Sequence, residues 1–382
     1  MIRRAATALT ALCLFACDRP AEAPAQTGGP APAAEPRPAA PATESPTLRA
    51  IRARGGLNCG VHVGLPGFAY PDTRGVWRGF DADLCRAIAA AALGDGDRVR
   101  FVRLRNDQRV PALVDGRVDV VMRNVTWTLA RDGGEGVDFA GVSYYDGQGF
   151  LVRRALDLQS ATELSGAAIC VQTGTTNGAN LADWAAEAGL QYRAVPVRDE
   201  GDGRARLQEE QCDALAGDVS ALAASRTVLN NPGGYVLLPE VISREPLGPM
   251  VREGDSGWAD VVRWTMNVLV LAEQVGVTQR AAASVEDDDP PARDAEARRL
   301  LQGGPGAGRA LGLDDDWAVR VIREVGNYGE LFERNLGARS PLRLQRGLNA
   351  LWNAPQPGLH YPLPMGEIAP SAAAPASTAP RP

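Results

Sequence analysis

Three consecutive segments, LNCGVHV (57–63), FDADLCRAIAAAAL (80–93) and VRFVRL (99–104), indicate the fold class most clearly. The first and third segments are short apolar runs, which are typical of strands. The middle segment is rich in alanine and predicts a helix. A strand, a helix and a second strand in this order favour a parallel pair of strands.

The same alternation continues along the chain and then starts again. A helix at 107–114 and a strand at 118–122 complete a first βαβαβ unit. Two successive units of this kind predict an α/β fold with two lobes, each a mainly parallel sheet with helices on both faces. The second unit consists of a strand at 167–172, a helix at 177–187, a strand at 192–197, a helix at 204–210 and a strand at 213–217.

Two apolar segments flanked by Gly or Pro, GQGFLV (147–152) and PLGPMV (246–251), are interpreted as a hinge of two crossing strands. The helix predicted at 258–273 contains charged residues and is therefore a core helix rather than a membrane span. A polar, glycine-rich stretch follows at about 282–312, and further helices are expected after it, at 317–325 and 342–352. The predicted boundaries are a first part of lobe 1 at 48–150, lobe 2 at 151–246, a return to lobe 1 at 247–355 and a disordered tail at 356–382.

The N-terminus has the pattern of an export signal. Arg3 and Arg4 precede an apolar run at 5–16 that is too short to span a bilayer. The run ends at Cys17 in a sequence similar to a lipobox, which predicts a signal peptide at 1–17 and lipidation of Cys17. Residues 18–47 are almost entirely Pro, Ala, Glu and Thr and behave as a linker. The alternative is an ordinary signal cleaved at a later Ala-x-Ala site.

The chain has six cysteines, of which Cys13 and Cys17 belong to the signal region. Export to an oxidising compartment favours disulfides among the remaining four. Three pairings are possible, and we favour two local bridges because each of these pairs lies inside one βαβ unit. The alternative is four buried thiols. The favoured bridges are Cys59 with Cys85 and Cys170 with Cys212.

Composition excludes several classes of function. A net charge of −6 and a pI near 5.2 argue against a nucleic-acid partner. With only His62 and His360, a histidine-rich zinc site is excluded, and we expect neither a metal nor a cofactor. The tetrapeptide GDSG (254–257) matches a serine-protease nucleophile motif, but it lies in an α/β context and is interpreted as a surface turn.

Ligands of doubly wound sheets bind beyond the carboxyl ends of the strands. After the strand at 118–122 come Asn124, Thr126 and Arg131, which together could hold a carboxylate. Asp218 follows another strand and suits an ammonium group. Between these two in the sequence, a predicted helix start offers hydroxyls and backbone amides suited to an anion, at Gly174, Thr175 and Thr176. Each signal alone is weak, because such residues more often serve as helix caps or turns.

The segment from Leu48 to Trp352 resembles the polar amino-acid-binding proteins of ABC importers, most closely the general L-amino-acid-binding branch. The resemblance is carried by the following segments: CG (59–60), GLPGF (64–68), DADLCRAI (81–88), NVTWTLARD (124–132), FAGVSYYDGQGF (139–150), VQTGTT (171–176), EPLGP (245–249), VGNYGE (325–330) and RGLNALW (346–352).

The resemblance implies a two-lobe periplasmic-binding-protein fold with a two-strand hinge. It also implies a monomer in the periplasm that binds L-amino acids and delivers them to membrane permease subunits. Arg131 would bind the ligand carboxylate and Asp218 its amino group. The remaining residues expected to contact the ligand are Asn124, Thr126, Thr175, Thr176, Gly174, Leu65, Phe68 and Trp127.

The sequence departs from the family pattern at His62, Leu65, Asn106 and 199–203, which leaves the side-chain preference open. One alternative is a dehydratase-like enzyme on the same scaffold, for which His62 is the one candidate general acid. Another is a tethered amino-acid sensor, which would need a transmembrane helix after the signal region.

Overall fold

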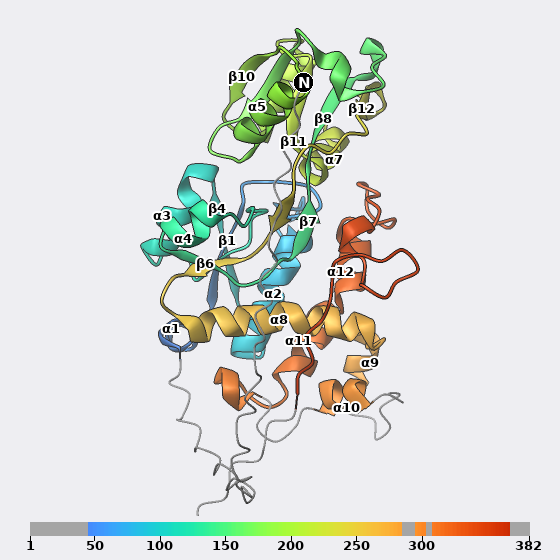
Figure 1. Ribbon diagram of the computed structural model, residues 1–382. Coiled ribbons are helices and arrows are strands. Elements are labelled where there is room, and N and C mark those ends of the chain that lie inside the picture. The colour runs from blue at the N-terminus through green and yellow to red at the C-terminus, as the bar shows by residue number, and fades with distance from the viewer. Residues whose placement is uncertain (1–44, 285–294, 303–307, 367–382) are drawn as a thin grey trace, which may run out of the picture. The chain divides into compact units, whose positions relative to one another are not determined.

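The computed structural model describes residues 45–284, 295–302 and 308–366. The predicted signal peptide, Cys17 and most of the linker lie outside these residues. Lobe 1 is built from the chain on both sides of lobe 2, and two short strands connect the lobes (Figure 1). The two-lobe α/β fold is therefore confirmed.

The first part of lobe 1 alternates strands and helices as predicted. The helix α2 has the predicted bounds, because Gly79 precedes it and Gly94 ends it with a left-handed φ of 74°. The elements are α1 (Pro46–Arg54), β1 (Leu57–His62), β2 (Tyr70–Pro71), β3 (Trp77–Arg78), α2 (Phe80–Leu93), β4 (Val99–Leu104), α3 (Arg109–Val114), β5 (Val120–Val121), α4 (Leu129–Gly134) and β6 (Val137–Phe139).

Lobe 2 repeats the arrangement. The alternating side chains of its strands face two different hydrophobic clusters, with Phe150 and Val152 in one cluster and Leu151 in the other. A strand buried on both faces in this way needs helices on both sides of the sheet. The elements are β8 (Gln148–Arg153), β9 (Ala168–Gln172), α5 (Asn177–Glu187), β10 (Arg193–Val197), α6 (Glu200–Gln208), β11 (Ala214–Asp218), α7 (Val219–Thr227) and β12 (Tyr235–Leu237).

Each lobe has a five-stranded sheet in which one strand opposes the others. The order is β4-β1-β5-β14-β6 in lobe 1 and β10-β9-β11-β8-β12 in lobe 2. The opposed strands are β14 (Met250–Arg252) and β8, and each directly follows a crossing between the lobes. The prediction of mainly parallel sheets is confirmed.

The crossing strands are β7 (Tyr144–Asp146) and β13 (Glu245–Leu247), which pair antiparallel. The prediction placed the hinge at 147–152 and 246–251, a few residues too late. The physical reason is burial: Gln148 to Val152 are all buried, so this run is a core strand of lobe 2 and not a linker.

The chain then returns to lobe 1 through α8 (Ser256–Gln274), which packs against α2 and α11. Ser45 at the start of the described chain donates to the Asp255 carboxylate at the cap of α8, at 2.8 Å. The remaining helices are α9 (Gln279–Ala283), α10 (Ala295–Gln302), α11 (Trp317–Val325) and α12 (Tyr328–Asn335).

The prediction of a helix at 342–352 is wrong. Only a single 3-10 turn forms, at Gly347–Asn349, because Arg343 and Gly347 both have left-handed φ values, of 50° and 47°. The chain after it also differs from the tail expected from residue 356. His360 is 5% exposed, and the backbone N–H of Leu363 donates to Asn267 of α8 at 2.6 Å. The described end of the chain thus packs on lobe 1.

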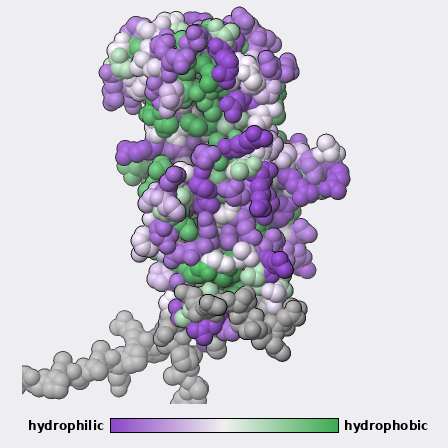
Figure 2. Space-filling view, turned by 90° about the vertical axis from the view of Figure 1, so that its right-hand side faces the viewer, coloured by the Kyte–Doolittle hydropathy of each residue, from purple (hydrophilic) through white to green (hydrophobic). Residues whose placement is uncertain are grey.

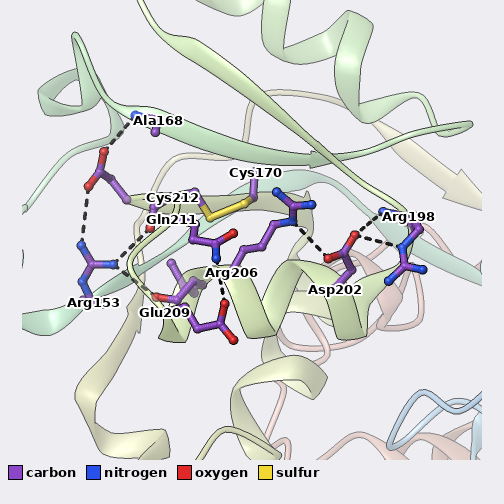
Figure 3. Close-up of a disulfide and its surroundings, with 11 residues drawn as sticks. Arg153, Ala168, Cys170, Arg198, Asp202, Arg206, Glu209, Gln211 and Cys212 are labelled. Atoms are coloured by element: carbon purple, nitrogen blue, oxygen red, sulfur yellow. Dashed lines mark hydrogen bonds and ion pairs between the residues drawn. A yellow bond between two sulfur atoms is a disulfide. The ribbon is translucent and has the colours of Figure 1, made fainter.

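Both predicted disulfides are present, Cys59–Cys85 in lobe 1 and Cys170–Cys212 in lobe 2. Figure 3 shows the second one beside Arg153, which donates to the carbonyl oxygens of Leu207 at 3.2 Å and Cys212 at 3.1 Å. These bonds hold the same turn that the disulfide ties to β9.

The visible face is mostly hydrophilic with small hydrophobic patches (Figure 2). No helix within the described residues is both long and apolar enough to cross a membrane.

Candidate ligand-binding site

A cavity lies between the lobes, where the carboxyl ends of β5, β9 and β11 meet. Side chains from both lobes line it, and most of them are polar. From lobe 1 come Asn106, Arg109, Arg123, Asn124, Thr126 and Arg131, and from lobe 2 come Gln172, Thr175, Thr176, Asn177, Val197, Asp199, Glu200, Leu215, Ala216, Gly217, Asp218, Ala221, Leu222 and Ser225. The structure therefore brings together six of the ten residues predicted to contact the ligand.

Arg131 lies in α4, whose N-cap Thr128 accepts from the Arg131 backbone. Its guanidinium donates to the carbonyl oxygen of Thr126 at 2.7 Å, which fixes the side chain toward the cavity. Burial lowers the pKa of Arg131, and nearby carboxylates oppose this effect. Arg131 makes no salt bridge with a described residue, so its remaining donors suit an anionic group.

Asp218 ends β11 and is 9% exposed. Burial raises the pKa of Asp218 well above its usual value, and the neighbouring carboxylates of Asp146 and Glu245 raise it further. Within the described chain Asp218 has no salt-bridge partner. A buried carboxylate is stabilised by a cationic partner, so this position suits an ammonium group.

The three residues predicted to bind the ligand in the loop after β9 have different surroundings. Thr176 lines the cavity and donates to Glu245 at 3.0 Å. Thr175 also lines it, but its hydroxyl donates to the Gln172 carbonyl at 2.8 Å and so stabilises the turn. Gly174 lines a neighbouring cavity instead, and its carbonyl accepts from Arg109 of lobe 1 at 3.0 Å.

Three predicted contacts lie outside the cavity. Leu65 and Phe68 are 0% and 1% exposed within the core of lobe 1. Phe68 packs edge-on against Phe80 and Tyr144. Trp127 is 37% exposed and stacks on Phe139 at a centroid distance of 5.6 Å. The structure thus does not place these three residues at the cavity, and they pack within lobe 1 instead.

Sequence reasoning missed several lining residues. Arg109 and Arg123 are nearly buried, and Arg123 donates to the Leu104 carbonyl at 2.8 Å. Gln172 is the last residue of β9, so the rule that ligands bind beyond strand ends could have found it. Glu200 begins α6 and carried no comparable signal.

Three lining side chains have a buried polar atom without a hydrogen-bond partner among the described residues. They supply two acceptors and one donor, and a polar ligand would satisfy such groups. The atoms are Asn124 Oδ1, Gln172 Nε2 and Asn177 Oδ1.

His62 lies at the end of β1 and does not line the cavity. Its Nδ1 accepts from the backbone of Gly64 at 3.0 Å, and its Nε2 lies 3.0 Å from Glu200 of lobe 2. Burial lowers the pKa of His62, although Glu200 opposes this change. Both ring nitrogens thus face protein groups, which leaves His62 poorly placed to act as a general acid toward a ligand. In the described part of the chain, no group of three or more metal-ligating side chains forms a metal site.

This arrangement, a polar cavity between two lobes joined by two strands, defines a binding protein of the two-lobe class. The chain belongs to the bacterial extracellular solute-binding proteins, family 3, whose model matches residues 57–275.

Among its relatives is the glutamate/glutamine/aspartate/asparagine-binding protein BztA of Rhodobacter capsulatus, 47% identical over 85% of this chain and 94% of that protein. The general L-amino acid-binding periplasmic protein AapJ of Rhizobium johnstonii is 46% identical, again over 85% and 94%. A solved ABC transporter/periplasmic binding protein from Brucella ovis, with glutathione bound, superposes with a TM-score of 0.79. It is 46% identical, over 84% of this chain and 99% of that one.

Proposed function

We propose that this protein is the substrate-binding component of an ABC importer and binds L-amino acids between its two lobes. The observation that carries the proposal is that one cavity contains both a cationic and an anionic side chain. Arg131 offers hydrogen-bond donors to an anion, and Asp218 is a buried carboxylate that suits a cation. An α-amino acid presents both groups on one carbon. The names of the relatives support this ligand class. The role is binding and delivery to a permease, by a monomer and without catalysis.

A thermal-shift screen of the twenty L-amino acids tests the ligand class, because a ligand that binds only the folded state raises the unfolding midpoint. We expect several L-amino acids to raise it, and sugars and keto acids to leave it unchanged. A shift with sugars alone would contradict the proposal.

Two variants test the charges. Arg131→Ala and Asp218→Ala each leave a ligand charge buried without its partner, which costs about 2 to 5 kcal/mol for comparable pairs. Affinity measured by calorimetry should therefore fall about 30-fold to several thousandfold. Arg100→Ala and Asp183→Asn are matched controls, because both residues are exposed and outside the cavity. Unchanged affinity in Arg131→Ala would refute the carboxylate contact.

A larger ligand is a second candidate. A neighbouring cavity shares Asn106, Arg109 and Arg131 with the first and continues past Val110 and Met250. The Brucella ovis relative holds glutathione, a peptide with an α-amino-acid end. Glutathione therefore belongs in the screen, and a shift larger than that of any free amino acid would favour it.

Export to the periplasm and lipidation of Cys17 complete the proposal. The signal-like sequence at 1–17 and the periplasmic relatives support export. Cys17→Ala should move the protein from the membrane fraction to the soluble fraction. Unchanged membrane association would exclude the lipid anchor while leaving the binding function untouched.

A further inference from the structure

Glu245 is a buried carboxylate in the crossing strand β13, 2% exposed, with no salt-bridge partner among the described residues. It accepts hydrogen bonds from four neutral side chains. Thr126 belongs to lobe 1, Thr176 and Asn180 belong to lobe 2, and Ser243 precedes the crossing strand. One carboxylate in the hinge thus joins side chains of both lobes.

These bonds determine what the two threonines can offer a ligand. A hydroxyl has one proton to donate, and its oxygen otherwise accepts. Thr126 and Thr176 both donate to the same oxygen of Glu245, Oε2. Both also line the cavity, so each presents only its lone pairs there. These two hydroxyls suit a donor such as an ammonium group, and in this arrangement their protons are not directed toward a carboxylate.

The carboxyl groups around Glu245 also favour a positively charged ligand group on this side of the cavity. Asp218 and Glu245 are close enough that Glu245 helps to raise the pKa of Asp218. Asp146, directly opposite Glu245 in the crossing ribbon, adds a third carboxylate. This side of the cavity is therefore rich in carboxyl groups, whose ionised forms an ammonium group would stabilise.

We propose that Glu245 is a positioning residue for the ligand's ammonium group. It holds the hydroxyls of Thr126 and Thr176 with their lone pairs toward the cavity, and it does so from the strand that connects the lobes. The two hydroxyls meet at Glu245 only when the lobes are in contact, so ammonium binding and lobe closure reinforce each other. This inference rests on the proposed binding of amino acids.

The test is Glu245→Gln, which keeps the size of the side chain but adds an amide donor. A hydroxyl facing that amide must accept, and its proton then points elsewhere. Affinity for the L-amino acid identified in the screen should fall about 10-fold to 100-fold, as for loss of a hydrogen bond to a charged group. Thr126→Val and Thr176→Val should show similar losses, and Glu187→Gln, at an exposed position, should show none.

Two measurements separate positioning from a structural role. The first is competition by the matching α-hydroxy acid, which lacks the positive charge. Glu245→Gln should reduce its affinity less than that of the amino acid, whereas equal losses for both ligands would overturn the proposal.

The second measurement needs only the amino acid. In a double-mutant cycle, Glu245→Gln combined with Thr126→Val should lose little more than the larger single loss, because the two groups act together. Additive losses would overturn the proposal even if the hydroxy acid binds too weakly to measure. A parent protein that binds no L-amino acid would instead refute the proposed function, and the role of Glu245 with it.

Discussion

Removing the disulfide between Cys170 and Cys212 should lower the free energy of unfolding by about 4 kcal/mol, according to the loop-entropy relation for a separation of 42 residues. That relation attributes the loss to the unfolded chain, which gains freedom when the bridge is absent. The native turn has other supports, since Arg153 bonds to the Cys212 carbonyl and Asp213 accepts from the backbone of Ala168 at 2.9 Å. We therefore expect lobe 2 to keep its structure and the ligand affinity to change little.

The assay is urea unfolding of the Cys170→Ala/Cys212→Ala variant and of its parent, both without Cys17. The Cys59→Ala/Cys85→Ala variant is the matched comparison, for which a separation of 26 gives about 3.5 kcal/mol. The two losses should thus be similar in size. An unchanged midpoint with an unchanged urea dependence would refute the reasoning, because it would mean that the bridge does not constrain the unfolded chain.

Two further predictions concern the segment that packs beside the hinge. Burial lowers the pKa of His360 to about 3 from an ordinary 6.5, with Arg346 adding to the effect. Between these two pKa values the unfolded chain binds a proton on His360 that the folded chain does not bind. The free energy of unfolding should therefore decrease as the pH is lowered from about 6.5, by up to about 1.4 kcal/mol per pH unit. His360→Phe should remove this part of the acid sensitivity in urea unfolding at several pH values, and equal pH slopes would contradict it. Asn349 bonds to both the N–H and the carbonyl of Tyr145, at 2.7 and 2.9 Å. Asn349→Ala should cost about 2 to 3 kcal/mol by calorimetric unfolding, and a loss below about 1 kcal/mol would show that water replaces the bonds.

Local patterns were sufficient for most of the framework. The α2 helix and the strands β1, β4, β5, β9, β10 and β11 follow from apolar runs whose ends are marked by glycines or polar residues. The other four sheet strands were missed or assigned to the hinge. The disulfide pairing was predicted correctly because the two cysteines of each pair lie within one βαβ unit. Where a pattern was locally ambiguous, the prediction failed: the apolar residues between 342 and 352 looked helical, yet two left-handed residues prevent a helix there.

The site was predicted where it depends on strand ends and missed where it depends on distant contacts. Asp218 is the last residue of β11 and Arg131 lies in α4, the next element after β5, so a rule about the carboxyl ends of strands located both. Glu200 was missed because the predicted helix began at 204, whereas the Asp199 cap starts α6 at Glu200. Glu245 lies 119 residues from Thr126, and only the folded chain shows that they meet.

Both ends of the described chain belong to lobe 1, where Ser45 bonds to Asp255 and Leu363 to Asn267 at the two sides of α8. Lobe 2 is an insertion whose chain enters and leaves through β7 and β13. A tether attached at the N-terminus would therefore join lobe 1 directly and reach lobe 2 only through the crossing strands. A fluorescent reporter of opening would accordingly be placed on lobe 2, with its reference on lobe 1.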